Sequence, residues 1–117
     1  MSLVGWNCQG VGAALTGRHL KFICHKYRPP LVFLSEIRAN ISKVDRLRRR
    51  LGYDYAEYVE PVNTGGGLAL WWKSTVVLGL VIKNRNFFHV KVSRGLGPVS
   101  GYITMVYGPP TERERRE

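Results

Sequence analysis

The stretch RPPLVFLSEIR, residues 28–38, is the part of the sequence from which the fold can be argued. Its two prolines end any preceding helix. The run from Leu31 to Ser35 is almost wholly apolar, without the alternation of a half-exposed strand, and this favours a strand covered on both faces. A carboxylate, Glu36, follows where the strand should end, and desolvating an unpaired carboxylate is costly. We therefore expect Glu36 to point into a polar cleft or to meet a cation.

The segments around this strand predict the order strand, helix, strand, helix. A short strand is expected at residues 3–7, with a glycine-rich turn after it. Thr16 is predicted to cap a helix whose apolar residues recur at i, i+3, i+4 and i+7, namely Leu20, Ile23, Cys24 and Tyr27. Ser42 is predicted to cap a second helix, which ends at Leu51 with Gly52 as its C′ residue.

Beyond residue 52 the pattern changes to a succession of strands. Strand-like runs separated by turns occur at residues 53–59, 67–72, 75–83, 87–93 and 99–107. We therefore expect one mixed α/β domain over residues 1–117, antiparallel in its second part, with Trp71 and Trp72 pointing to opposite faces. A capping-box spacing at residues 111–114 begins a helix too short to be stable unpacked. The domain is thus expected to be incomplete at its C-terminus and to lack the sheet that would cover its apolar strands.

The composition favours a polyanionic partner. Eighteen Lys and Arg against eight Asp and Glu give a net charge of +10 and a pI near 10.1, which favours nucleic acid first and an anionic membrane surface second. A basic domain without a charged partner stays open. No apolar run approaches the roughly 20 residues of a membrane span, and no targeting signal is seen. The two cysteines lack metal-ligand spacing and are expected to be reduced, so the expected location is intracellular, with the nucleus included.

A dinucleotide-binding domain is an alternative interpretation. A strand, a glycine turn, a helix and an acid at the end of the second strand imitate the Rossmann layout. Leu15, however, stands at the third glycine position. The later chain also runs from strand to strand without the alternating helices of that fold.

Four motifs, in order, resemble one known family. They are GWNCQGVG (residues 5–12), RPPLVFLSEIR (28–38), GGGLALWWK (65–73) and VYGPP (106–110). Together they resemble the endonuclease/exonuclease/phosphatase superfamily, particularly the endonuclease domain of plant LINE-type (non-LTR) retrotransposons. The resemblance implies a four-layer α/β sandwich, two mixed β-sheets flanked by helices, of which this chain would be the N-terminal half. It also implies an endonuclease that hydrolyses phosphodiester bonds in DNA with Mg²⁺ or Mn²⁺ and that is fused to or encoded with a reverse transcriptase.

The resemblance implies three catalytic residues. Asn7 would orient the phosphate and the metal, Glu36 would bind the metal, and the Tyr107 hydroxyl would reach the scissile phosphate. One carboxylate suits Mg²⁺, which fills its octahedron with water and phosphate oxygens. Gln9 stands where the family often has an acid, and the family's Gly-Asp-x-Asn and Ser-Asp-His motifs do not occur in these 117 residues. The chain alone is therefore expected to be inactive.

Simpler roles stay open for each of these residues. Asn7 could pin the glycine turn, Glu36 could pair with Arg38 or Lys43, and Tyr107 could face solvent. A basic face of the second helix, with Arg38 before it, is expected to contact phosphates, although such a face is often only solvated. The residues proposed for this contact are Arg38, Lys43, Arg46, Arg49 and Arg50, with Arg48 on the same helix. A catalytically dead remnant that binds nucleic acid through its charge is the second functional hypothesis.

Overall fold

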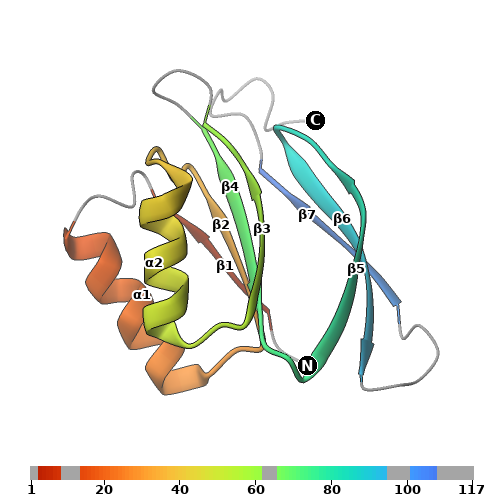
Figure 1. Ribbon diagram of the computed structural model, residues 1–117, viewed down its shortest axis with the longest axis horizontal. Coiled ribbons are helices and arrows are strands. Elements are labelled where there is room, and N and C mark those ends of the chain that lie inside the picture. Colours follow the sequence, from red (N-terminus) through yellow and green to blue (C-terminus); the bar gives the residue numbers. More distant parts are fainter. Residues whose placement is uncertain (1–2, 9–13, 62–65, 95–100, 108–117) are drawn as a thin grey trace, which may run out of the picture.

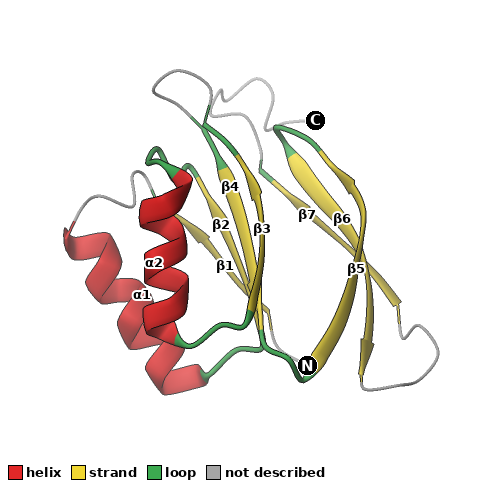
Figure 2. Cartoon of the chain, viewed as in Figure 1, coloured by secondary structure: helices red, strands yellow, loops and turns green. Residues whose placement is uncertain are grey.

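The computed structural model describes residues 3–8, 14–61, 66–94 and 101–107, which form two helices and two sheets in three layers (Figure 1; Figure 2). The elements are, in chain order, β1 (Leu3–Asn7), α1 (Ala14–Tyr27), β2 (Leu31–Ser35), α2 (Ile41–Leu51), β3 (Tyr55–Val59), β4 (Leu68–Trp72), β5 (Val76–Lys83), β6 (Phe87–Arg94) and β7 (Gly101–Val106). This order confirms the mixed α/β prediction. Within these ranges no helix is long and apolar enough to cross a bilayer.

The first sheet has the strand order β1-β2-β4-β3. β1 is parallel to β2, while β4 is antiparallel to both of its neighbours. The two central strands, β2 and β4, have every residue buried, which confirms the prediction for residues 31–35. Trp71 and Trp72 pack in different cores, one on each face of the sheet, as their adjacent positions in a strand require.

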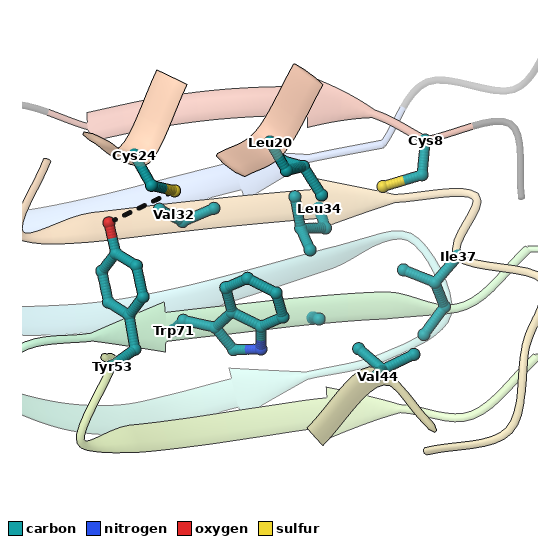
Figure 3. Close-up of a cluster of buried hydrophobic side chains, with 10 residues drawn as sticks. Cys8, Leu20, Cys24, Val32, Leu34, Ile37, Val44, Tyr53 and Trp71 are labelled. Atoms are coloured by element: carbon teal, nitrogen blue, oxygen red, sulfur yellow. Dashed lines mark hydrogen bonds between the residues drawn. The ribbon is translucent and has the colours of Figure 1, made fainter. Parts of the chain in front are cut away.

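One face of this sheet is covered by α1 and α2. Leu20 and Cys24 of α1 and Val44 of α2 pack with Trp71 in a core that also holds Tyr53 (Figure 3). The Tyr53 hydroxyl donates to the carbonyl of Pro29 at 2.7 Å and lies 3.7 Å from the Cys24 sulfur. The phenol thus has a hydrogen-bond partner inside an apolar layer, which avoids the cost of burying it unpaired.

Both predicted helix caps were wrong, while the C-terminal prediction for α2 is confirmed. Asn40, with φ −68° and ψ 152°, caps α2: its side chain accepts from the backbone N–H of Lys43 at 2.9 Å. Ser42 instead donates its hydroxyl to the side chain of Asn40 at 3.1 Å. Asn40 is the cap because it, and not Ser42, has the extended backbone conformation that a cap needs. Thr16 lies inside α1, which begins at Ala14. Gly52 ends α2 with φ +84°, the left-handed C′ conformation.

The second sheet is antiparallel, in the order β5-β6-β7, and it covers the other face of the first sheet. Phe88 and Val90 of β6 share a core with Phe33 of β2, and the Phe33 and Phe88 rings meet edge to face with centroids 6.1 Å apart. The expectation that the chain lacks a partner sheet was therefore wrong. The uncovered surface is instead the outer face of this second sheet.

Candidate active site

The site lies where β1 and β2 end side by side. Because these strands are parallel, their carboxyl ends meet at one edge of the sheet, and Asn7 is the register partner of Ser35. The backbone N–H of Cys8 donates to the carbonyl of Ser35 at 2.8 Å, which extends the pairing one residue beyond the strands. Glu36 comes next, so the structure places Asn7 and Glu36 on adjacent strand ends.

Glu36 is held in an unusual backbone conformation. Its φ is +52° and that of Arg38 is +45°, in the left-handed region that costs a non-glycine residue roughly 1–3 kcal/mol. The turn is fixed from the other side by glycine carbonyls, since the N–H of Ile37 donates to Gly67 at 3.3 Å and that of Arg38 to Gly66 at 3.1 Å. Glu36 itself is 7% exposed. A buried carboxylate in a strained, hydrogen-bonded turn is typical of functional sites.

The second sheet supplies a partner for this carboxylate. Tyr107 follows β7 and is anchored by its N–H, which donates to the carbonyl of Asn86 at 2.7 Å. The Tyr107 hydroxyl donates to Glu36 Oε1 at 2.5 Å, a short bond of the kind made to charged acceptors. Arg38 Nη2 lies 3.5 Å from the same oxygen. The structure therefore brings Glu36 and Tyr107 together and excludes the alternative that Tyr107 only touches solvent, while the pairing of Glu36 with Arg38 is present.

Asn7 differs from these residues because it is exposed. It ends β1 at the same edge as Glu36. Its assignment as a ligand of phosphate or metal stays a prediction, as do the catalytic roles of Glu36 and Tyr107.

The oxygen donors at this edge suit a loosely held Mg²⁺ or Mn²⁺ ion. In the part of the chain that the structure describes, no group of three or more His, Cys, Asp and Glu could hold a metal ion. One or two carboxylates are nevertheless enough for Mg²⁺, which keeps several waters and takes phosphate oxygens from a substrate. A carboxylate has about four lone-pair sites, so the hydrogen bond from Tyr107 leaves Glu36 with capacity for a cation. The edge therefore fits a weakly held ion completed by water and substrate, and not a closed protein cage.

Two further features lie at this edge: Cys8, which is a buried thiol as the sequence predicted, and Gly67, which was not singled out from the sequence. Burial raises the pKa of the Cys8 thiol to about 12, and the negative charge of Glu36 adds to the rise. Cys8 is therefore a protonated thiol at neutral pH and not a nucleophile. Gly67 has φ +90°, and a Cβ there would lie 2.6 Å from Ile37 Cγ1. The signal available for Gly67 was the run of three glycines before β4.

The basic residues divide into two groups. Arg38 is at the site, and Lys43 is in the first turn of α2, whereas Arg46, Arg49 and Arg50 lie farther along the helix as it runs back from this edge (Figure 1). At about 1.5 Å per residue, the end of α2 is some 15 Å from its start.

Arg48 has a structural role and does not belong to a phosphate-binding face. It donates to Asp45 at 2.7 Å and to the carbonyl of Tyr53 at 2.6 Å. Its hydrogen bond lowers the pKa of Asp45 to about 2. Asp45 in turn accepts from the hydroxyl of Tyr58 in β3 at 2.7 Å. Through these hydrogen bonds Asp45 connects α2 to the first sheet, and Arg48 connects it to the segment that leads into β3.

Comparison with known proteins identifies the fold. No family model and no curated protein sequence matches the chain. Among solved structures it is similar to humanized D. rerio TDP2 carrying 14 mutations, with a TM-score of 0.61 and 20% identity over 97% of this chain and 52% of that one. It is also similar to the AP endonuclease LMAP from Leishmania major, with a TM-score of 0.58 and 15% identity over 89% of this chain and 38% of that one. Both neighbours are members of the endonuclease/exonuclease/phosphatase superfamily.

These likenesses confirm the predicted fold class: a mixed α/β chain that matches part of the endonuclease/exonuclease/phosphatase fold. The chain spans about half of the first neighbour, 52% of its length, and 38% of the second. The dinucleotide-binding alternative is wrong, because β4 is antiparallel to both of its neighbours where a Rossmann sheet is mostly parallel.

Proposed function

We propose that this chain is part of a divalent-metal-dependent endonuclease domain that hydrolyses phosphodiester bonds in DNA. The observation that carries the proposal is the hydrogen bond from Tyr107 to the buried carboxylate of Glu36. It joins the ends of two sheets at one edge, in a fold shared with an AP endonuclease.

The chain's own residues have separable roles in this proposal. Glu36 would hold Mg²⁺ or Mn²⁺ through its carboxylate, with the amide oxygen of Asn7 beside it. When bound, the ion would neutralise charge on the phosphoryl oxygens in the transition state. The Asn7 amide would donate to a phosphate oxygen. The single O–H of Tyr107 donates to Glu36 in the structure, so it would donate to the phosphate only after turning away from Glu36, once the ion has taken that carboxylate. Both donors stabilise developing charge without adding charge of their own.

The chain by itself is expected to bind nucleic acid and not to cleave it. The family's Gly-Asp-x-Asn and Ser-Asp-His motifs are absent from its sequence, and with them the general base, whose contribution is typically about 10²–10⁴-fold. The net charge of +10 favours binding in their absence. A binding remnant without activity is therefore the second candidate function.

We further propose that the domain derives from a LINE-type retrotransposon, is encoded with a reverse transcriptase and acts inside the cell, where its DNA substrate is found. The four ordered sequence motifs support this origin. The check is the genomic sequence that surrounds the coding region. A reverse transcriptase frame beside it is expected, and an unrelated gene context would contradict the proposal.

The test separates metal binding from chemistry. Binding of Mn²⁺ to the chain is measured by electron paramagnetic resonance. Glu36→Gln keeps the shape of the side chain but removes its charge, so it should weaken binding, whereas Glu60→Gln, at an exposed carboxylate on the same edge, should not. The chain is then fused to the C-terminal half of a related complete domain, and nicking of supercoiled plasmid with Mg²⁺ is followed.

In the fusion we expect Glu36→Gln to lose at least about 100-fold in nicking rate, since metal charge stabilisation is worth several kcal/mol and about 1.36 kcal/mol corresponds to tenfold. Asn7→Ala should lose somewhat less, because it removes neutral donors, and Tyr107→Phe least, because it removes one hydroxyl. Full activity in a folded Glu36→Gln fusion would mean that Glu36 is not the metal ligand.

A further inference from the structure

The two helices carry most of the net charge of the chain. Within α1 and α2 there are eight Lys and Arg and a single acid, Asp45. Asp45 is paired with Arg48 and Arg49 and bonded to Tyr58 of β3, so it is directed toward the first sheet. The outer surface of the helical layer is therefore cationic and lies on the opposite side of the first sheet from the second sheet (Figure 1).

A groove runs between the helices on this surface. Its volume is about 340 Å³, and it is lined by Gly17, Arg18 and Lys21 of α1 and by Leu47, Arg50 and Leu51 of α2. The three cations are exposed, while the two leucines are only partly exposed. Among the described atoms, a Cβ on Gly17 would meet nothing within 4 Å, so this glycine leaves the groove open.

Beside the groove, α1 presents exposed aromatic rings together with further cations. Phe22 and Tyr27 are each 61% exposed, and Lys26 Nζ lies 5.6 Å from the centroid of Phe22 and 5.2 Å from that of Tyr27. Arg18, Phe22 and Lys26 follow one another at intervals of four residues, so they form a row along one face of the helix. Cation, aromatic ring and cation thus alternate next to a groove with an apolar floor.

We infer that this helical surface binds single-stranded nucleic acid, with phosphates on Arg18, Lys21 and Arg50 and bases against Phe22 and the apolar floor of the groove. A single strand exposes both its phosphates and the faces of its bases, and proteins bind it through a charged groove combined with aromatic side chains. A duplex hides its base faces, so it gains from the cations but not from Phe22 or the leucines. The inference does not rest on the proposed cleavage at Glu36, from which this groove is separated by the first sheet.

The test is fluorescence anisotropy of a labelled 12-nucleotide oligothymidylate and of a duplex of equal length, with the whole chain, over a range of salt concentrations. We expect the single strand to bind at least about tenfold more tightly than the duplex, because base stacking on an aromatic ring adds to the charge term. Replacing Arg18, Lys21 and Arg50 together by Gln should lower the affinity for the single strand and reduce its salt slope by about 2, since each phosphate contact contributes about 0.7.

Matched variants distinguish binding at this groove from a non-specific effect of the total positive charge. Replacing Lys83, Arg85 and Lys91, which lie on the second sheet or its β5–β6 turn, by Gln removes the same charge and should have a much smaller effect. Phe22→Ala should weaken the single strand about tenfold and leave the duplex unchanged. Gly17→Leu should block the groove while leaving every charge in place.

Three outcomes would overturn the inference. Equal losses in the two triple variants would assign binding to total charge, and a preference for duplex would remove the role of the exposed rings. Tight binding of an acidic, leucine-rich peptide, with weak binding of the oligonucleotide, would assign the groove to a protein partner. Each variant is checked by circular dichroism.

Discussion

The two sheets contain similar apolar runs but are covered differently. LVFLS of β2 and LALWW of β4 are buried at every position, because helices cover one face and the second sheet covers the other. VVLGLVIK of β5 is just as apolar, yet after its first residue it is partly or fully exposed. A continuous apolar run therefore predicts a strand but does not by itself tell how many faces are covered.

The largest expected difference between the sheets concerns large-to-small substitutions. Trp71→Ala, in the layer between helices and first sheet, removes a fully buried side chain and should lower the free energy of unfolding by about 3–5 kcal/mol. Tyr102→Ala, 63% exposed on the second sheet, should change it by less than about 0.5 kcal/mol. Urea denaturation followed by far-UV circular dichroism measures both. Equal losses would show that the outer face of the second sheet is covered in solution.

A smaller effect is expected from matched glycine substitutions. Gly67→Ala, just before β4, requires φ +90° and sets a Cβ 2.6 Å from Ile37 and 2.8 Å from Pro61, so it should cost about 1–3 kcal/mol of unfolding free energy. Gly79→Ala, in β5, meets Lys91 Cε at 2.6 Å. Because this flexible, exposed side chain can move away, the cost should be near zero. Thermal melts of both variants make the comparison, and a larger loss in Gly79→Ala would reverse the contrast drawn between the sheets.

The smallest effect on stability is expected on the outer face of the second sheet. Val77 is 48% exposed and Val106 is 62% exposed, so replacing both by Thr should change the unfolding free energy by less than about 0.5 kcal/mol. The change shrinks an apolar patch of the kind that promotes association, so sedimentation velocity should detect less self-association. Val90→Thr, which buries a hydroxyl in the shared core, is the destabilising control, at about 1–3 kcal/mol. Self-association that persists unchanged in the double variant would mean that this face is not the associating surface.

The sequence predicted most of the elements, because their signals are local. The apolar run at residues 31–35, the end of α2 at Gly52 and the succession of strands after it all match the structure. The predicted cap of α2 was wrong because Asn40 and Ser42 are both cap-type residues two positions apart, and only the backbone conformation decides between them. The second sheet was missed as a partner because its packing on Phe33 depends on residues more than 50 positions away, such as Phe88.

In the candidate site, too, features with a local sequence signal could be predicted and features that depend on distant residues could not. Glu36 could be singled out because a carboxylate at the end of a buried strand needs an explanation, and Asn7 and Tyr107 followed from resemblance. The 2.5 Å bond between Tyr107 and Glu36 had no local signal. Arg48 was grouped with surface cations, since its contacts with Asp45 and the Tyr53 carbonyl depend on how α2 meets the first sheet.

The strand order β1-β2-β4-β3 also constrains how the chain assembles during synthesis. β2 can pair with β1 once α1 has formed between them, but β3 adjoins only β4 within its sheet, so residues 55–59 have no place in the sheet until residues 68–72 have emerged. The contact between Tyr107 and Glu36 spans a longer stretch of sequence, because the Tyr107 hydroxyl that donates to Glu36 lies 71 residues later in the chain. A nascent chain therefore carries the site carboxylate through the synthesis of 71 further residues before the tyrosine that bonds to it is made.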